Sequence, residues 1–288
     1  MKRRRRRACS AAGGVLCWRL SRTRTLRPQH RLTDFFLMRL ALLTDLHANR
    51  EALTACLAHA QRQRVDRYAF TGDFVGYGAD PGWVIDTVMD YVARGAVAVQ
   101  GNHDEATVLR GPPHMHAEAR EVINWTREHL SDVQLNFLAG LPLVHAQGKL
   151  LFAHASAHEP GAWEYVRGVD QAELSLRAAA GAHIVFSGHV HAPGLFRRAD
   201  DGAMGYWQPA ARSVAVRVPL QPQHQYLVQP GSVGQPRDGN NAACYALYDD
   251  ERREVSFFRV PYDHGAAARR VIASGLPIVF AMRLVEGI

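Results

Sequence analysis

Residues that can bind metal ions follow five apolar stretches of the sequence. The clearest case is "IVFSGHVHAP" (184–193), in which His189 and His191 follow a short apolar run and a glycine. Alternation along an extended chain would direct both imidazoles to the same side. The residues of this kind that follow the five stretches are Asp45, His47, Asp73, Asn102, His154, His189 and His191, with His103 and Asp104 directly after Asn102.

The number and mixture of these donors argue against a single tetrahedral zinc ion. A lone histidine or aspartate after a strand is usually a turn or capping residue, but five successive occurrences are hard to explain that way. A mixed nitrogen and oxygen set of this size suits two divalent ions that share a carboxylate. We therefore expect two divalent metal ions as cofactors, Mn²⁺ in first place, with Fe, Zn, Ni or Co as alternatives.

The order of apolar patterns places these donors at the ends of strands. Apolar runs predict strands at 39–44, 67–71, 96–100, 150–154 and 183–189. Helical periodicity between them predicts helices near 49–63, 81–95 and 170–180, and one or two helices at about 117–139. Because ligands of open α/β sheets bind beyond the carboxyl ends of the strands, the donors should meet at one edge.

The last third of the sequence is richer in strands. Short β-rich pieces occur at 213–219, 225–229, 243–249 and 254–260, followed by a helix near 264–273. They suggest a second sheet. The order of predicted strands and helices along the chain predicts an α/β sandwich that forms a single domain over residues 38–288.

The positive net charge is confined to the first 37 residues. The chain carries a formal charge of +7, but residues 1–37 hold eleven of the 34 Lys and Arg and only one of the 27 Asp and Glu. The other 23 basic and 26 acidic residues make 38–288 mildly acidic, near −3. Residues 1–37 lack apolar periodicity and are predicted to be a disordered extension.

Three explanations of this extension compete. It resembles a transit peptide in being rich in arginine and poor in acids, and it would also serve as a basic arm for nucleic acid or anionic lipid. A translation start at Met38 is favoured over both, because "MRLALLTDLH" opens directly with the first predicted strand.

Neither the apolar runs nor the cysteines indicate a membrane or an oxidising compartment. The sequence has no apolar run of about 18 residues, so no membrane span is expected. Cys9, Cys17, Cys56 and Cys244 lack pair spacing, which favours buried free thiols in the cytoplasm over a disulfide or a zinc knot.

The donors also carry a family resemblance. In chain order, "DLH" (45–47), "GD" (72–73), "GNHD" (101–104), His154 and "GHVH" (188–191) resemble the signature of the calcineurin-like metallophosphoesterase superfamily. "QPGSVGQPRDGNNAACYAL" (229–247) and the ending "GLPIVFAMRLVEG" are similar to the small prokaryotic branch of that superfamily. The resemblance covers the chain from Met38 onward. It implies a four-layer αββα sandwich of two mixed β-sheets flanked by helices, the metallo-dependent phosphatase fold.

The resemblance implies a role for each donor. Asp45, His47 and His191 would hold one ion and Asn102, His154 and His189 the other, with Asp73 bridging the two. A hydroxide between the ions would attack the phosphorus atom. His103 would donate a proton to the leaving oxygen or stabilise the developing charge, and Asp104 would orient His103. Capping of the next helix is the alternative role for Asp104.

The sequence suggests fewer residues for substrate binding than for metal binding. Asn102 and Arg237 are predicted to bind it, Arg237 through its planar guanidinium group, although a surface ion pair would equally explain this arginine. Trp163 and Tyr165 have the chemistry to stack on a base or aryl group, but a core position is favoured for both. Asn49 is expected to cap the following helix or to support the first loop.

The predicted function is hydrolysis of a small, nucleotide-like phosphodiester or phosphomonoester. The Ser/Thr protein phosphatases resemble G-D-x-x-D-R-G, whereas this chain reads "GDFVGYG" (72–78), without the phosphate-binding arginine. One alternative is a non-catalytic metal-binding scaffold for partner proteins, disfavoured because every donor position is filled. A nuclease that uses the basic arm is another. It is disfavoured, and nucleic acid is not an expected partner, because 38–288 carries no basic stripe.

Overall fold

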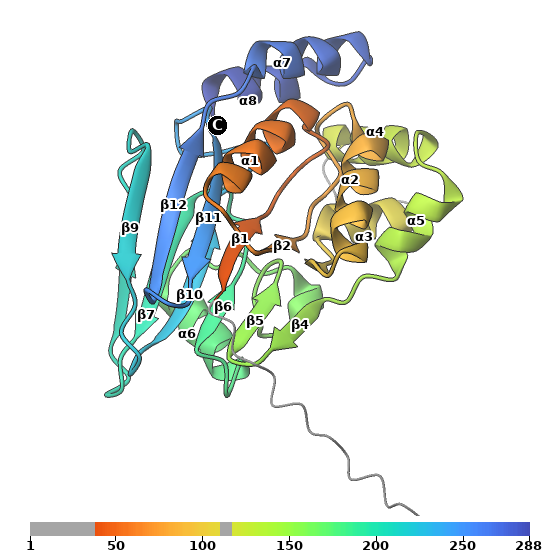
Figure 1. The fold of residues 1–288 in the computed structure, drawn as a ribbon. Helices are drawn as coiled ribbons and strands as arrows, with labels where there is room; N and C mark the ends of the chain where they lie inside the picture. The colour runs from red at the N-terminus through yellow and green to blue at the C-terminus, as the bar shows by residue number, and fades with distance from the viewer. Residues whose placement is uncertain (1–37, 110–116) are drawn as a thin grey trace, which may run out of the picture. The chain divides into compact units, whose positions relative to one another are not determined.

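The computed structural model describes residues 38–109 and 117–288, which belong to one compact unit spanning Leu37–Ile288. The predictions made for residues 1–37 lie outside the described residues. Within the compact unit, two six-stranded β-sheets are accompanied by helices (Figure 1).

The first sheet combines a parallel and an antiparallel half. In spatial order it contains β3 (Val97–Val99), β2 (Arg67–Thr71), β1 (Arg39–Leu43), β11 (Ala243–Asp249), β12 (Glu254–Val260) and β9 (Ala215–Pro219). β1, β2 and β3 are parallel, whereas β11 runs antiparallel to β1, with Leu40 opposite Tyr248. The loops that follow β1, β2 and β3 therefore emerge at one edge.

The second sheet repeats this arrangement. In spatial order it contains β4 (Val144–Gln147), β5 (Leu150–Ala153), β6 (Ile184–Phe186), β10 (Gln225–Pro230), β7 (Pro193–Arg198) and β8 (Met204–Trp207). β5, β6 and β10 are parallel, and β4, β7 and β8 pair antiparallel with their neighbours. The loops after β5, β6 and β10 thus also share an edge.

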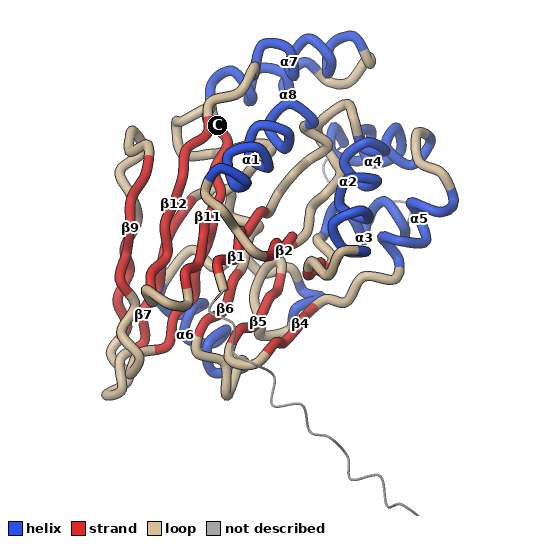
Figure 2. The backbone as a smooth tube through the Cα atoms, viewed as in Figure 1, coloured by secondary structure: helices blue, strands red, loops and turns tan. Residues whose placement is uncertain are grey.

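Helices accompany both sheets (Figure 2). They are α1 (Arg50–Arg62), α2 (Pro81–Ala93), α3 (Asn102–Leu109), α4 (Ala117–Glu128), α5 (Asp132–Ala139), α6 (Val169–Ala178), α7 (His264–Ala273) and α8 (Ile278–Glu286), with a 3₁₀ turn at Pro160–Ala162. α1 begins where the Asn49 side chain accepts a hydrogen bond from the Ala52 N–H at 3.0 Å, a standard N-terminal cap. Among the described helices, none has the length and apolar character that crossing a bilayer requires.

Alternation of side chains along the strands separates the layers. On β1, Ala41 and Leu43 pack in the core that includes α1 and α2, while Leu40 and Leu42 pack in the core between the two sheets. On β6, Val185 packs on the opposite side of the second sheet, in the core that includes α6. The order of layers is helix, sheet, sheet, helix, so the predicted αββα sandwich is confirmed.

Several element predictions need correction. The pattern missed the edge strands β4 and β8, the strand β7 that starts with a proline, and the C-terminal helix α8. Of the one or two helices predicted at 117–139, the structure has two, α4 and α5, and α5 begins with a capping box at Ser131, as predicted in number and place. The strand predicted at 183–189 stops at Phe186, because His189 and His191 have φ angles of 67° and 63°, which no strand accommodates.

Candidate metal centre

The loops after β1, β2 and β6 bring a first group of four buried side chains together. Asp45, His47, Asp73 and His191 offer ligand atoms that all lie within 4.8 Å of one another. Nε2 of His191 lies 3.1 Å from Nε2 of His47 and 3.2 Å from Oδ1 of Asp45. These are the residues predicted to surround the first ion.

A second group adjoins the first and shares Asp73 with it. Asp73, His154 and His189 are buried and offer ligand atoms within the same 4.8 Å limit. Nε2 of His154 lies 3.3 Å from Oδ2 of Asp73, 3.2 Å from Nδ1 of His189 and 3.2 Å from Oδ1 of Asn102, the first residue of α3. The structure thus places the residues predicted for the second ion around the same aspartate.

The two groups are built from strained backbone. Asp45, His47, Asp73, His189 and His191 all have φ between 45° and 67°, in the left-handed region. Such conformations cost on the order of 1–3 kcal/mol each and persist where the surroundings hold them. Here the N–H of Asp45 donates to the carbonyl of Gly72 at 3.0 Å, and the N–H of His47 donates to that of Asp73 at 2.9 Å.

Backbone carbonyls fix the tautomers of three of the imidazoles. Nδ1 of His47, His154 and His191 contacts the carbonyl oxygens of Val75, Thr71 and Gln235 at 3.0, 2.7 and 2.6 Å. A carbonyl oxygen only accepts, so each Nδ1 carries a hydrogen and donates it. In the neutral ring, each Nε2 therefore presents a lone pair to the cluster.

This arrangement fits a bound cation. Two Nε2 lone pairs that face each other at 3.1 Å, as in His47 and His191, repel unless positive charge lies between them. A proton or a metal ion would supply that charge. The carboxylates of Asp45 and Asp73 beside the same nitrogens complete a mixed nitrogen and oxygen set, which suits a divalent metal ion.

Charge and burial oppose each other within the cluster. Burial would raise the pKa of Asp73, but the neighbouring imidazoles, His154 foremost, hold it well below its usual value. Burial likewise opposes ionisation of Asp45, yet His191 holds its pKa below the usual value. Burial would lower the pKa of His154, but the Asp73 carboxylate raises it to about 9. Both carboxylates therefore stay ionised and attract cations.

His103 lies beside the cluster at the start of α3. The centre of its ring is 5.1 Å from that of His47 and 4.5 Å from that of Tyr77. The backbone N–H of His103 donates to Oδ1 of Asp73 at 2.8 Å, which leaves Oδ2 of that aspartate for the two ligand groups. Burial lowers the pKa of the His103 imidazole.

Asp104 has other partners than the one predicted. Its Oδ1 accepts hydrogen bonds from the N–H groups of Phe74 and Val75 at 2.9 and 3.3 Å, and its Oδ2 accepts from Gly101 at 2.9 Å. The described residues contain no hydrogen bond between Asp104 and His103, whose Nδ1 is buried without a partner. The contact with Gly101 caps α3, so the geometry fits the alternative role, a cap that also ties the loop after β2.

Arg237 and Tyr77 form a pair near His103. A guanidinium nitrogen of Arg237 lies 3.4 Å from the hydroxyl oxygen of Tyr77 and 3.3 Å from Oε1 of Gln235. In the described part of the chain Arg237 has no carboxylate partner, so the surface ion pair considered for it is not seen there. No role was predicted for Tyr77, although glycines flank it on both sides.

The two aromatic residues expected in the core lie at the cluster instead. Tyr165 is 39% exposed, and its ring stacks on that of His189 with centres 3.9 Å apart. Arg167 covers Tyr165 at 4.2 Å. Nε1 of Trp163 donates to Glu105 at 2.8 Å. The core prediction is therefore wrong for Tyr165, whose ring covers the imidazole of His189.

The fold and the cluster together define a class of protein. Two mixed sheets deliver buried aspartates and histidines from the carboxyl ends of parallel strands to two adjoining cation sites. This is the architecture of a metallophosphoesterase.

The chain belongs to the calcineurin-like phosphoesterase superfamily, whose domain model matches residues 38–253. It is 30% identical over 253 residues to an uncharacterised protein of Methanocaldococcus jannaschii, a match that covers 86% of this chain and 98% of the relative. The crystal structure of a metallophosphoesterase from Sphaerobacter thermophilus is similar, with a TM-score of 0.77 and 31% identity, over 88% of this chain and 100% of that chain.

A more distant structure has the same fold. A hypothetical protein from Pyrococcus horikoshii matches with a TM-score of 0.67 and 20% identity, over 86% of this chain and 98% of that chain. The resemblance to prokaryotic members of the superfamily is thus confirmed.

Proposed function

We propose that the protein hydrolyses a small, nucleotide-like phosphodiester or phosphomonoester with the help of two divalent metal ions, Mn²⁺ in first place. The observation that carries the proposal is the position of Asp73. Its Oδ2 lies 3.8 Å from Nε2 of His47 in one ligand group and 3.3 Å from Nε2 of His154 in the other. When bound, a pair of ions would supply Lewis acidity to the phosphoryl group and would lower the pKa of a nearby water molecule.

The chain's own residues would complete the reaction. His103 donates a proton to the leaving oxygen, a role that suits an imidazole lying beside the ligand cluster, with its ring centre 5.1 Å from that of His47. Arg237, free of a carboxylate partner in the described part of the chain, binds a non-reacting phosphoryl oxygen through its planar fork. Tyr77 positions Arg237 through the contact between its hydroxyl group and the guanidinium. Asn102, at the second ligand group, contributes its Oδ1 to the ion and its amide hydrogens to the substrate.

The proposal is tested with the full-length protein, stripped of metal and reloaded with Mn²⁺. Turnover of bis-p-nitrophenyl phosphate is compared with that of p-nitrophenyl phosphate, and the ratio identifies the substrate class. We expect His103→Ala to lower kcat about 100-fold or more with bound metal unchanged, since proton transfer contributes on that scale. We expect Asp73→Asn to lose both metal and turnover. His129→Ala, at an exposed position, serves as the control.

One result would overturn the proposal. A protein that binds two Mn²⁺ ions per chain and hydrolyses neither compound is not a general phosphoester hydrolase. The scaffold alternative would then explain the intact ligand set.

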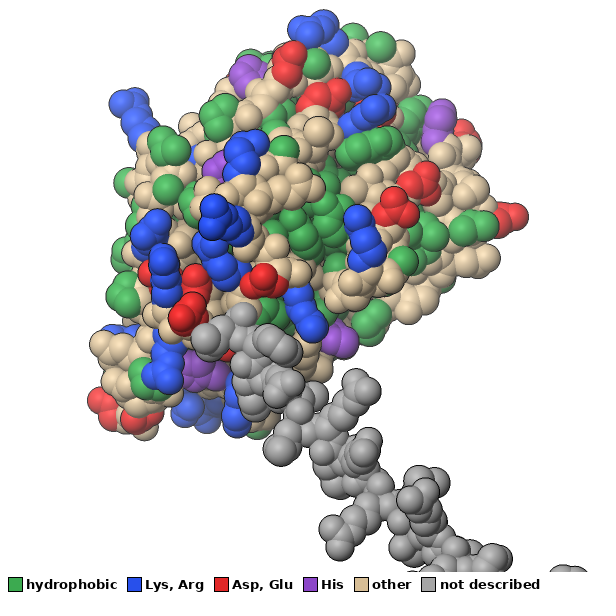
Figure 3. All heavy atoms as spheres, viewed as in Figure 1, with side chains coloured by type: hydrophobic (Ala, Val, Ile, Leu, Met, Phe, Trp, Pro, Cys, Tyr) green, Lys and Arg blue, Asp and Glu red, His purple; other side chains and the backbone are tan. Residues whose placement is uncertain are grey.

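The described surface does not favour a nucleic-acid partner. On the face that Figure 3 shows, basic and acidic side chains are interspersed. Ion pairs within the described part of the chain include Arg39 with Asp249 and Arg270 with Glu51. Phosphate backbones are bound by continuous basic surfaces, so a small substrate suits this chain better. We also propose a cytoplasmic location, since Cys56 and Cys244 are buried free thiols.

A further inference from the structure

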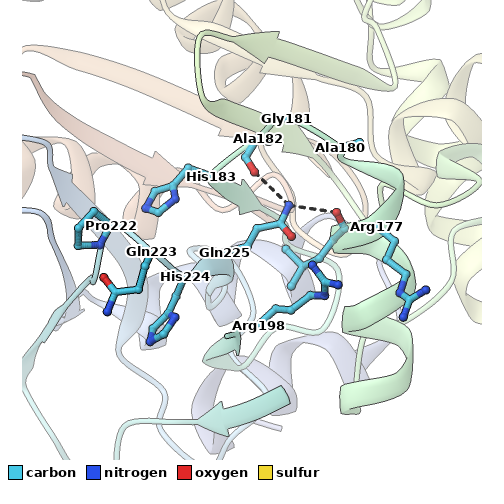
Figure 4. A pocket seen from close by; sticks show the side chains of 11 residues that line it. Arg177, Ala180, Gly181, Ala182, His183, Arg198, Pro222, Gln223, His224 and Gln225 are labelled. Atoms are coloured by element: carbon cyan, nitrogen blue, oxygen red, sulfur yellow. Dashed lines mark hydrogen bonds between the residues drawn. The ribbon is translucent and has the colours of Figure 1, made fainter. Parts of the chain in front are cut away.

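A pocket of about 410 Å³ opens at the amino ends of β6 and β10 (Figure 4). Its walls come from the end of α6, the residues before β6, the end of β7 and the residues before β10. His183 of this pocket precedes β6, whereas the metal-site residue His189 follows it. The whole of β6 (Ile184–Phe186) lies between them, so the pocket and the metal-site residues are at opposite ends of this strand. The pocket is therefore a separate feature from the metal centre.

The pocket is lined by nitrogen-rich side chains and by no acid. Among the described residues that line it are Arg177, His183, Arg198 and His224, and none is an aspartate or a glutamate. Figure 4 shows the two histidines on one side and Arg177 on the other, with Arg198 between them. Such a lining attracts anions.

Arg198 is the group that lacks a partner. Arg177 is engaged by Glu173 at 2.7 Å, but within 38–109 and 117–288 Arg198 makes no ion pair or side-chain hydrogen bond, and its Nε is buried. Nδ1 of His224 is buried without a partner as well. Both nitrogens therefore have unmet hydrogen-bonding capacity, which is unfavourable for a buried polar group.

The side-chain amide nitrogen of Gln225, also in the wall, is already satisfied. Nε2 of Gln225 donates to the carbonyl oxygens of Leu176 and Ala182 at 3.1 and 3.0 Å, shown as dashed lines in Figure 4. Among the described residues, Arg198 shares neither of these acceptors and has no ion-pair partner, so it is available for an acceptor from outside the protein.

We propose that this pocket binds a small phosphorylated ligand, with the phosphate group held by Arg198 and His224. The guanidinium fork matches two phosphate oxygens, which a lysine or a lone imidazole does not. The volume lies within the range of about 300–1,000 Å³ that is usual for small-molecule pockets, so it has room for more than the phosphate group. The ligand is a second, non-reacting anion, because the pocket contains no part of the metal centre.

Equilibrium dialysis with ³²P-labelled inorganic phosphate tests this site in the metal-loaded, full-length protein. We expect two phosphate sites in the wild type. Asp73→Asn should lose the site at the metal centre and keep the pocket. Arg198→Ala should lose the pocket site, with at least about tenfold weaker binding, and keep phosphoesterase turnover. Arg212→Ala removes an arginine that is exposed and lies outside the pocket, and it should change neither.

A second variant and a second probe complete the test. Arg198→Lys keeps the charge but loses the fork, so it should bind phosphate more weakly than the wild type while melting at the same temperature. Competition by AMP that is stronger than that of unlabelled phosphate would identify a phosphorylated small molecule as the ligand, whereas equal or weaker competition would identify phosphate itself. The proposal is wrong if Asp73→Asn binds no phosphate, or if Arg198→Ala binds two phosphates with wild-type affinity.

Discussion

Asp73 connects the residues on which the proposed chemistry depends. One carboxylate oxygen accepts the backbone N–H of His103 at 2.8 Å, and the other faces His47 and His154. A substitution that keeps the shape but removes the charge would leave several imidazoles without their counter-ion. The same hydrogen bond fixes the start of α3, and so the position of the His103 ring.

The residue scale also shows what a sequence can predict. The ligand residues were recognisable because each follows an apolar strand. The partners of Asp104 and Tyr77 were not, because Phe74 and Arg237 lie 30 and 160 positions away along the chain. Only the folded loops decide which of these groups meet.

Gly76 allows the His103 ring to occupy its place. A Cβ atom at Gly76 would lie 2.5 Å from Nδ1 of His103, and φ there is +87°. We expect Gly76→Ala to displace the imidazole and lower kcat about 10-fold to 100-fold, with metal content retained. Gly95→Ala is the matched control, since its φ is +94° but nothing lies within 4 Å of the added atom. Equal loss of kcat in both variants, measured with the same ester, would attribute the effect to backbone strain alone.

At the scale of elements, local sequence patterns predict single strands but do not predict which strands pair with each other. β1 and β2 were predicted from their apolar runs, but no local signal reveals that β1 pairs with β11, some 200 residues later. β11 is buried at all of its positions, so it shows no alternation to indicate which side faces which layer. No contact between the segment after β10 and the loop after β1 was predicted, yet Gly234 donates its N–H to the carbonyl of Asp45 at 2.8 Å.

Asn49 joins the start of α1 to the segment that follows β10. Its Oδ1 caps α1, and its amide nitrogen donates to the carbonyl of Gly234 at 2.8 Å, so both roles considered for it are present. We expect Asn49→Ala to lower the free energy of unfolding by about 2–3 kcal/mol, because a cap and a buried hydrogen bond are both lost. Asp263→Ala removes a cap alone, from α7 at an exposed site, and should cost about 1 kcal/mol. Urea denaturation measures both, and equal losses would mean that the contact with Gly234 contributes nothing.

The whole molecule is divided between two sheets that meet at the metal centre. The first sheet supplies Asp45, His47, Asp73 and Asn102, and the second supplies His154, His189 and His191. Bound ions would therefore link the two halves of the sandwich. The order of the strands in each sheet could not be predicted, because it depends on crossovers whose direction no single segment encodes.

Metal removal should consequently destabilise the entire domain. Metal at 1,000 times its Kd contributes about 4 kcal/mol, and for a domain of this size we expect the melting temperature to fall by about 10 °C on chelation.

This difference in melting temperature between the metal-bound and metal-free protein should depend on pH through His154, whose pKa in the metal-free protein is raised to about 9 by Asp73 despite burial. A protonated imidazole cannot bind a metal ion, so protons compete more strongly as the pH falls. The gain in melting temperature on adding metal should be larger at pH 8.5 than at pH 6.5, and it should shrink in Asp73→Asn. Scanning calorimetry with and without chelator at each pH decides the matter, and equal gains at both values would contradict the assignment of His154 as a ligand.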